Sequence, residues 1–234
     1  MKKLLYLHGF ASSGASGTVG LLRRELFEKR KTDKVAVVAP DIPVDPMEAL
    51  PMLKDLANAE SPDLIIGTSM GGGYAQQLRG FKRICVNPSF GLSGLHSVLS
   101  VGKHKWLSRR KDGTTEFHVT KEIIAHFKEM ESHQFEGVCD EDRLLCHGLF
   151  GTQDSLLRAD NRVLFERHYP GMLRMFEGGH RMNDDVVKNV LLPYIQEKGL
   201  LDDDDDYVKG IYKNITNVVE VKKVGNGEYE VGIA

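Results

Sequence analysis

The segment Gly67-Thr68-Ser69-Met70-Gly71 holds a serine between two glycines, a pattern that can present a nucleophile. It follows the apolar run Leu64–Ile66 and precedes a segment of helical spacing, which is the context of a strand–turn–helix nucleophile elbow. In such an elbow the hydroxyl stands at a helix N-terminus, where free N–H groups and the helix dipole favour negative charge. The bare pattern also occurs by chance, so its place between strand and helix carries the prediction that Ser69 is a nucleophile.

A serine hydroxyl barely ionises near neutral pH, so it needs a base within hydrogen-bond reach. His180 is the predicted base, because it ends the segment Glu177–His180 that follows the last apolar run. The other candidates fit less well. His8 comes too early in the chain, His147 falls inside a predicted strand, and His168 falls on a predicted helix and is expected to be exposed.

The imidazole must in turn be oriented by a carboxylate, which also stabilises its positive charge. Asp154 ends the segment Gly151–Asp154, which closely follows the predicted strand Leu144–His147. We therefore expect its carboxylate at the same sheet edge as the serine and the histidine, in the chain order serine, acid, histidine. Asp160 stays open as the alternative acid, although it falls within the following predicted helix.

Acyl transfer also requires N–H donors for the charge that develops on the carbonyl oxygen. The N–H of Met70, directly after the nucleophile, is one predicted donor. The N–H of Phe10 is the other, because Gly9 in the preceding loop lets the backbone approach the reacting atoms closely. An ordinary strand-ending turn is the alternative interpretation of His8-Gly9. The residues expected to contact the substrate are His8, Gly9, Phe90 and Trp106.

These loops need a scaffold, and short apolar runs alternating with helical patterns indicate an α/β fold with a mainly parallel sheet of about six strands flanked by helices. The runs carry few charges, as expected when both faces of a sheet are buried. The predicted strands are Leu4–Leu7, Val35–Ala39, Leu64–Gly67, Arg83–Val86, Leu144–His147 and Leu173–Phe176. The predicted helices are Thr18–Lys29, Pro46–Asn58, Met70–Arg79, Val119–Glu131 and Asp185–Lys198.

Residues 88–142 interrupt this alternation and are too many for a plain connection between two strands, so we predict a lid insertion. It carries a basic stretch, Lys103–Lys111, which could attract an anionic substrate group or could be the solvated face of a loop. We expect the lid's Trp106 and Phe90 either to line an acyl pocket or to anchor the lid.

The tail forms a second predicted unit, residues 201–234, after a hydrolase-like domain over residues 1–200. Its acidic run Asp202–Asp206 repels itself and should form an extended linker. Val218–Val224 and Glu228–Ile233 flank Gly225-Asn226-Gly227, which predicts a β-hairpin extension, because Asn-Gly suits the positive φ angles of a tight turn. This hairpin could pair with a sheet edge or join two subunits as a homodimer.

The composition bounds the remaining classes. A formal net charge of −2 gives no reason to expect nucleic acid or an anionic membrane as partner. Cys85, Cys139 and Cys146 are odd in number and lack CxxC spacing, which favours reduced thiols over disulfides or zinc ligands. The apolar start ends at Leu7, short of the roughly 7–15 apolar residues of a secretory segment, and no run approaches the roughly 20 of a membrane span. We expect a cytoplasmic protein.

Taken together, the motifs resemble those of small bacterial α/β-hydrolase esterases of the YqiA type. Leu5–Ser13 resembles the opening of these proteins, and Gly67–Ala75 resembles their nucleophile segment. Asn87–Ser89, Gly151–Asp154 and Glu177–His180 match in order and approximate spacing.

The resemblance covers roughly residues 2–198 and implies a minimal α/β-hydrolase fold that cleaves carboxylic esters or thioesters without a cofactor. Two features depart from it. The lid region is longer and more basic than expected, and the tail from Leu201 onward has no recognised counterpart. Both departures concern substrate choice rather than the predicted triad.

The leading hypothesis is therefore a serine hydrolase that acts on carboxylic esters or thioesters through an acyl-enzyme on Ser69. The same triad could serve a peptidase, a C–C hydrolase or a perhydrolase, because these activities share the fold. A non-catalytic ligand-binding protein on a hydrolase scaffold is the third interpretation. The expected partner is a small-molecule ester or acyl thioester, with no nucleic acid, membrane span, metal or cofactor.

Overall fold

The computed structural model describes residues 1–157, 159–202, 218–223 and 229–233. The chain divides into two compact units, residues 1–187 and 188–234. The expected domain boundary near residue 200 and the expected lid bounds stay predictions. The acidic run beyond Asp202 and the Gly-Asn-Gly turn lie outside the described residues.

A six-stranded sheet in the order β2-β1-β3-β4-β7-β8 forms the centre of the first unit, and every neighbouring pair in it is parallel. The strands are β1 Lys2–Leu7, β2 Val35–Val38, β3 Leu64–Thr68, β4 Arg83–Val86, β7 Cys146–Gly151 and β8 Leu173–Phe176. The fold class predicted from the alternation of apolar runs and helical patterns is confirmed.

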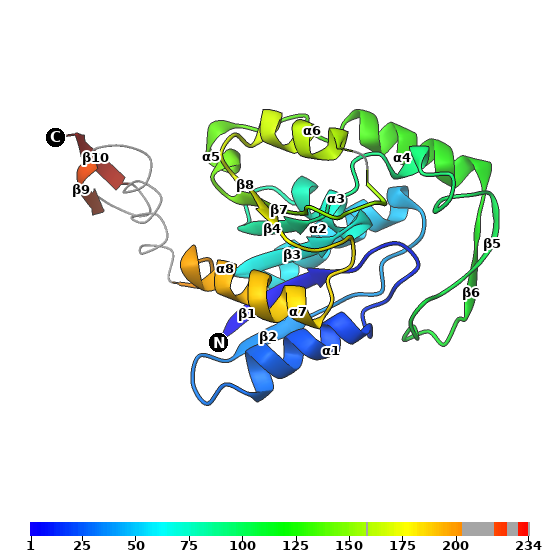
Figure 1. Cartoon of the computed structure of the whole chain (residues 1–234), viewed down its shortest axis with the longest axis horizontal. Helices are drawn as coiled ribbons and strands as arrows, with labels where there is room; N and C mark the ends of the chain where they lie inside the picture. Colours follow the sequence, from blue (N-terminus) through cyan, green and yellow to red (C-terminus); the bar gives the residue numbers. More distant parts are fainter. Residues whose placement is uncertain (158, 203–217, 224–228, 234) are drawn as a thin grey trace. The chain divides into compact units, whose positions relative to one another are not determined.

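Helices cover both faces of this sheet: α1 lies on one face, and α3 and α6 lie on the other (Figure 1). The α-helices of the first unit are α1 Gly17–Arg23, α2 Pro46–Glu60, α3 Met70–Gln77, α4 Lys121–Ser132, α5 Asp140–Arg143, α6 Asp160–His168 and α7 Asp184–Val186. Shorter elements are the π-helix η1 Arg24–Glu28 and the 3-10 helix η2 Leu92–Gly94, and the π-helix η3 Val187–Leu191 crosses the boundary between units.

One predicted strand is displaced. The expected Leu144–His147 is in fact β7 at Cys146–Gly151, because α5 and a turn in which Leu145 N–H donates to Asp142 O precede it. Apart from His147, the residues from Leu144 to Gly151 are uncharged and mostly apolar, so hydropathy alone does not locate the strand among them. The shift moves the strand's end closer to Asp154.

The predicted lid region contains a hairpin that the sequence did not predict, β5 Gly102–Lys105 paired antiparallel with β6 Glu116–Val119. It lies beyond the carboxyl-terminal edge of the large sheet, at the end toward which the β1 arrow points (Figure 1). The alternation of side chains gives it two faces. His104 and Phe117 are on the inner face, and Lys103 and Lys105 are exposed on the outer face.

The second unit contains α8 Leu192–Glu197 and a two-stranded antiparallel sheet of β9 Val218–Lys223 and β10 Tyr229–Ile233. The pairing confirms the predicted C-terminal hairpin.

Candidate functional site

Ser69 occupies a strained turn between β3 and α3, with φ 53° and ψ −121°. Such a backbone costs about 1–3 kcal/mol and persists only where its surroundings enforce it. Glycines on either side of Ser69 make the tight turn possible. A Cβ added at Gly67 would overlap the Gly71 carbonyl, and one added at Gly71 would overlap the Leu7 carbonyl. Both glycines are therefore required for the turn that presents the Ser69 hydroxyl.

The structure brings Ser69, His180 and Asp154 into one chain of hydrogen bonds. His180 Nε2 lies 3.0 Å from Ser69 Oγ, and His180 Nδ1 lies 2.8 Å from Asp154 Oδ2. Because the carboxylate only accepts, Nδ1 carries a proton, and in the neutral ring Nε2 is free to accept the serine proton. This is the arrangement that a general base and its orienting carboxylate require.

Asp154 is held from its other side as well. Its Oδ1 accepts the N–H groups of Leu156 at 2.9 Å and Leu157 at 3.1 Å, which leaves Oδ2 for His180. The alternative acid, Asp160, is exposed at the start of α6. The observed contact with His180 therefore belongs to Asp154.

The loop after β1 passes directly beside the serine. A Cβ built on Gly9 would lie 3.4 Å from Ser69 Cβ and 3.9 Å from Ser69 Oγ, so the Gly9–Phe10 backbone borders the hydroxyl. Met70 begins α3, and the first N–H groups of a helix lack partners within it. These positions are compatible with the predicted pair of oxyanion donors.

The His8 side chain, predicted to contact the substrate, has both ring nitrogens bonded to backbone groups. Its side chain is 1% exposed, Nε2 accepts the N–H of Ile42 at 3.0 Å, and Nδ1 donates to Gly9 O at 2.8 Å. Burial lowers the pKa of this imidazole to about 4, which keeps the ring neutral. His8 therefore holds the backbone of the Gly9 loop through its ring nitrogens, and its contact with a substrate stays a prediction.

The lid hairpin fastens the same loop from outside. Leu107 N–H donates to Ala11 O at 2.7 Å, and Ser13 Oγ donates to Arg109 O at 2.8 Å. The Phe10 ring packs edge-on against Phe117, with 5.5 Å between centroids. The predicted oxyanion residue is thus part of an aromatic cluster with the hairpin.

Phe90 and Trp106 are packed as anchors of the lid region. The Phe90 ring is 6% exposed and contacts the rings of Phe135 and Phe165, at 5.0 Å and 6.4 Å between centroids. The Trp106 ring lies 4.1 Å from Phe117, and the Arg110 guanidinium lies 4.1 Å from its centroid. Of the two expected roles, these contacts favour anchoring over lining an acyl pocket.

The basic stretch is not one continuous patch. Lys103 pairs with Glu116 at 2.5 Å, and Arg110 is buried, donating to Ile42 O at 3.1 Å. Lys105, Arg109 and Lys111 are the other exposed cations of the stretch, with Lys105 on the outer face of the hairpin. The stretch is therefore partly structural.

Sequence reasoning gave no role to Asn87, which the structure places between the acid loop and the histidine loop. Its side chain donates to Gly179 O and His180 O and accepts from Gly151 N–H. Its position directly after β4, at the sheet edge where the other loops meet, was the signal in the sequence that could have found it.

His168, expected to be exposed, is half-buried and stacks on Phe135 at 4.2 Å.

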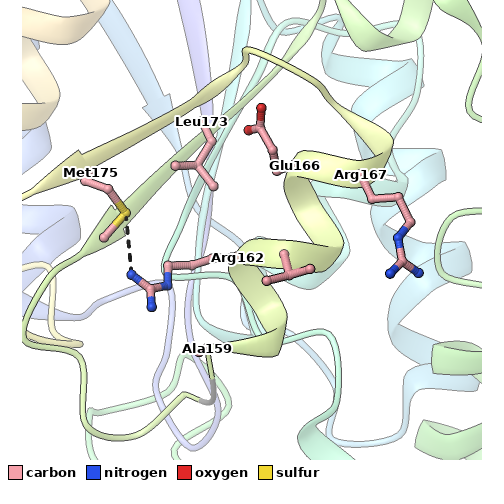
Figure 2. A pocket seen from close by; sticks show the side chains of 7 residues that line it. Ala159, Arg162, Glu166, Arg167, Leu173 and Met175 are labelled. Atoms are coloured by element: carbon pink, nitrogen blue, oxygen red, sulfur yellow. Dashed lines mark hydrogen bonds between the residues drawn. The ribbon is translucent and has the colours of Figure 1, made fainter.

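A separate hollow of about 530 Å³ lies between α6 and the edge strand β8 (Figure 2). Arg162 crosses it toward Met175, with 4.0 Å between Nη1 and Sδ. Its lining is Ala159, Arg162, Val163, Glu166, Arg167, Leu173 and Met175, and includes none of the three hydrogen-bonded site residues.

In the described part of the chain, no helix is long and apolar enough to span a membrane.

Comparison with solved structures shows the α/β-hydrolase fold. A thioesterase domain from the curacin biosynthetic pathway is 15% identical, with a TM-score of 0.54 over 86% of this chain and 91% of that one. Alpha/beta hydrolase domain-containing protein 10 from mouse is 13% identical, with a TM-score of 0.56 over 83% and 88%. An esterase domain of a Rhodothermus marinus protein is 17% identical, with a TM-score of 0.50 over 90% and 85%.

The model of one protein family matches residues 3–169, which contain the elbow and the Asp154 loop. The match spans well over half of the chain and confirms the resemblance to YqiA-type proteins that the motifs indicated. The chain belongs to the uncharacterised protein family UPF0227.

Proposed function

We propose that this protein is a serine hydrolase that cleaves carboxylic esters or thioesters through an acyl-enzyme on Ser69. The observation that carries the proposal is the continuous chain of hydrogen bonds from Ser69 Oγ through His180 to Asp154 Oδ2. The strained elbow supports it, because a backbone held at this cost is a feature of functional sites. Similar solved structures include a thioesterase domain and an esterase domain.

In the acylation step, Ser69 Oγ attacks the substrate carbonyl carbon while His180 Nε2 takes the hydroxyl proton. The carbonyl oxygen becomes negative in the tetrahedral intermediate and accepts hydrogen bonds from the N–H groups of Phe10 and Met70. His180 then gives its proton to the departing alcohol or thiol, which leaves an acyl ester on Ser69.

In the deacylation step, His180 takes a proton from water, and the hydroxide attacks the acyl carbon. Collapse of the second tetrahedral intermediate releases the carboxylic acid and returns the proton to Ser69 Oγ. Asp154 holds the imidazole in the tautomer with hydrogen on Nδ1 throughout and stabilises its positive charge. The scheme consumes one water for each ester bond.

Labelling with a fluorophosphonate probe tests the nucleophile directly. The wild-type protein should be labelled, and Ser69→Ala should not be, because the probe reacts only with an activated serine. Ser16→Ala provides a matched control at another serine and should label like the wild type. Equal labelling of Ser69→Ala would remove Ser69 from the mechanism.

A substrate panel distinguishes the proposed bond from the alternatives that share a triad. We expect turnover of p-nitrophenyl esters or acyl-CoA thioesters to exceed turnover of aminoacyl amides. Preference for the amides would point to a peptidase. Binding of a small ligand without turnover of any ester would point to a non-catalytic protein.

A further inference from the structure

Asn87 stands where β4 ends, in the left-handed region of backbone conformation with φ 42°. Asparagine tolerates this region better than most residues, because its short polar side chain can bond locally. Its main-chain N–H donates to Leu149 O of β7 at 2.8 Å, and its side chain is almost fully buried. The residue is therefore fixed at the sheet edge.

The Asn87 amide joins two other loops. Nδ2 donates to Gly179 O and His180 O, at 3.0 Å each, and Oδ1 accepts the N–H of Gly151 at 2.7 Å. The orientation follows from its partners, because a flipped amide would set an oxygen against two carbonyl oxygens. Both amide hydrogens are thus used on the segment that carries His180.

Other bonds hold this segment on both sides of His180, including one from Thr18 Oγ1 to Met182 O at 3.3 Å. Thr152 N–H donates to Phe176 O and Gln153 N–H donates to Gly178 O, both at 2.9 Å. The two carbonyls that follow, those of Gly179 and His180, are the ones that accept from Asn87. The Asn87 amide therefore contacts the carbonyl groups on both sides of the His180 Cα.

We propose that Asn87 is a positioning residue for His180, setting the backbone from which the imidazole reaches both Ser69 and Asp154. The inference rests on the proposed hydrolase mechanism and adds a fourth residue to it. The amide does not touch the reacting atoms. It acts on the geometry of the base, where a displacement of about 1 Å can lower the rate by about 100-fold.

Two substitutions distinguish a role in positioning His180 from a role in the stability of the fold alone. Asn87→Ala removes all three side-chain hydrogen bonds. Asn87→Asp keeps the shape and the bond from Gly151, but as a carboxylate it sets a negative oxygen against two carbonyl oxygens. In its protonated form the introduced carboxyl can donate to one of them, so ionisation disrupts the contact.

The charged groups near residue 87 affect how easily the carboxyl introduced by Asn87→Asp ionises. Asp154 of the β7–α6 loop and Arg162 of α6 line a cavity of about 140 Å³ together with Asn87, and His180 lies on the bonded segment. Asp154 disfavours a second negative charge, whereas Arg162 and protonated His180 favour one. Because these influences oppose one another, kcat/KM of both variants is measured over a range of pH and not at a single pH.

We expect kcat for ester hydrolysis to fall by about 10- to 100-fold in both variants, with KM changed by less than about threefold. The ratio of Asn87→Asp to wild-type kcat/KM should decrease as pH rises from 5.5 to 8.5. The same ratio for Asn87→Ala should stay constant, because alanine does not titrate. Flat ratios for both variants, or kcat within about threefold of wild type, would overturn the inference.

Gln134→Glu is the matched control, because Gln134 is a second buried amide with the same pattern of bonds. Its Nε2 donates to Gly73 O and Gln76 Oε1, at 2.7 Å each, and its Oε1 accepts from Gln77. The change should lower the melting temperature without giving the ratio of kcat/KM the pH slope of Asn87→Asp. An equal pH slope of kcat/KM in Gln134→Glu and Asn87→Asp would contradict the inference, because any buried carboxylate would then have the same effect.

A readout that does not require turnover completes the test. The low-field proton resonance of the hydrogen bond between His180 Nδ1 and Asp154, assigned by its loss in Asp154→Ala, should shift or broaden in folded Asn87→Ala. An unchanged resonance would contradict the inference. Full esterase activity in Ser69→Ala would instead contradict the proposed function, and the two failures are therefore distinguishable.

Discussion

Several side chains at the candidate site make supporting contacts in addition to those of the proposed chemistry. Asp154 presents one oxygen to His180 because two backbone N–H groups hold the other. His8 occupies both ring nitrogens with backbone groups and thereby fixes the loop beside Ser69. Such supporting bonds hold the reacting groups in place before a substrate binds. Catalysis by proximity and by electrostatic stabilisation raises the reaction rate mainly through this preorganisation.

Asp154→Asn should keep the shape of the site and lose the function of its carboxylate. An amide can stabilise the wrong tautomer of His180 and cannot stabilise its positive charge, so kcat should fall by about 10⁴-fold with little change in KM. Steady-state kinetics on a p-nitrophenyl ester measure this. Asp160→Asn, at the alternative acid, serves as the control and should keep wild-type kcat, whereas a reversed result would exchange the two assignments.

His8 should make stability depend on pH in a defined window. Its pKa is about 4 in the folded protein, against about 6.5 in an unfolded chain. As pH falls through this window the unfolded state takes up the proton first, so stability is present above pH 6.5 and is lost toward pH 4. The full loss is about 3 kcal/mol.

His8→Gln removes this titration, while the amide oxygen can still accept from Ile42 N–H. Urea unfolding of both proteins at pH 7 and near pH 4 should show a steeper loss of unfolding free energy in the wild type. The same loss in both proteins would mean that His8 is not the group responsible.

At the scale of elements, parallel strands bring the four loops of the site to one edge. The loops after β1, β3, β7 and β8 all leave the carboxyl ends of strands that pair in register, so residues more than a hundred positions apart meet there. The β5–β6 hairpin adds a wall at this edge. Its inner face packs on Phe10, and its outer face carries Lys103 and Lys105.

The exposure of Lys105 and Arg109 yields a prediction about substrate charge. Lys105→Ala with Arg109→Ala should change KM for an acyl-CoA and for a neutral ester by the same small factor, about twofold or less, because exposed cations contribute little. Parallel KM measurements at low and high salt test this. A selective rise in KM for the acyl-CoA would instead assign these residues to an anionic substrate group.

At the scale of the whole molecule, the candidate site belongs to one unit. Ser69, Asp154 and His180 all lie within residues 1–187, and so does the main hydrophobic core cluster. The second unit includes α8 and the β9–β10 hairpin. The core that holds the site is therefore built without residues beyond 200.

A chain that ends at Leu200 should keep wild-type kcat/KM and a similar melting temperature. Ester hydrolysis and thermal unfolding of this truncated chain and the full chain measure both quantities. A large drop in activity would show that the tail contributes to the site.

A homodimer through the C-terminal hairpin, one of the two roles expected for it, makes a separate prediction for the full and truncated chains. Sedimentation should give a dimer for the full chain and a monomer for the truncated one. The same species in both samples would remove the hairpin as the subunit interface.

The sequence by itself determined the sheet, the elbow and the histidine that lies beside Ser69. Hydropathy and chain order suffice for these, because buried parallel strands are apolar and the GxSxG turn needs its glycines locally. Tertiary structure decided what depends on contacts across the chain. Asp154 rather than Asp160 meets His180, His8 turns to the backbone, and Asn87 spans two loops, since side-chain direction at a sheet edge follows from where neighbouring strands end.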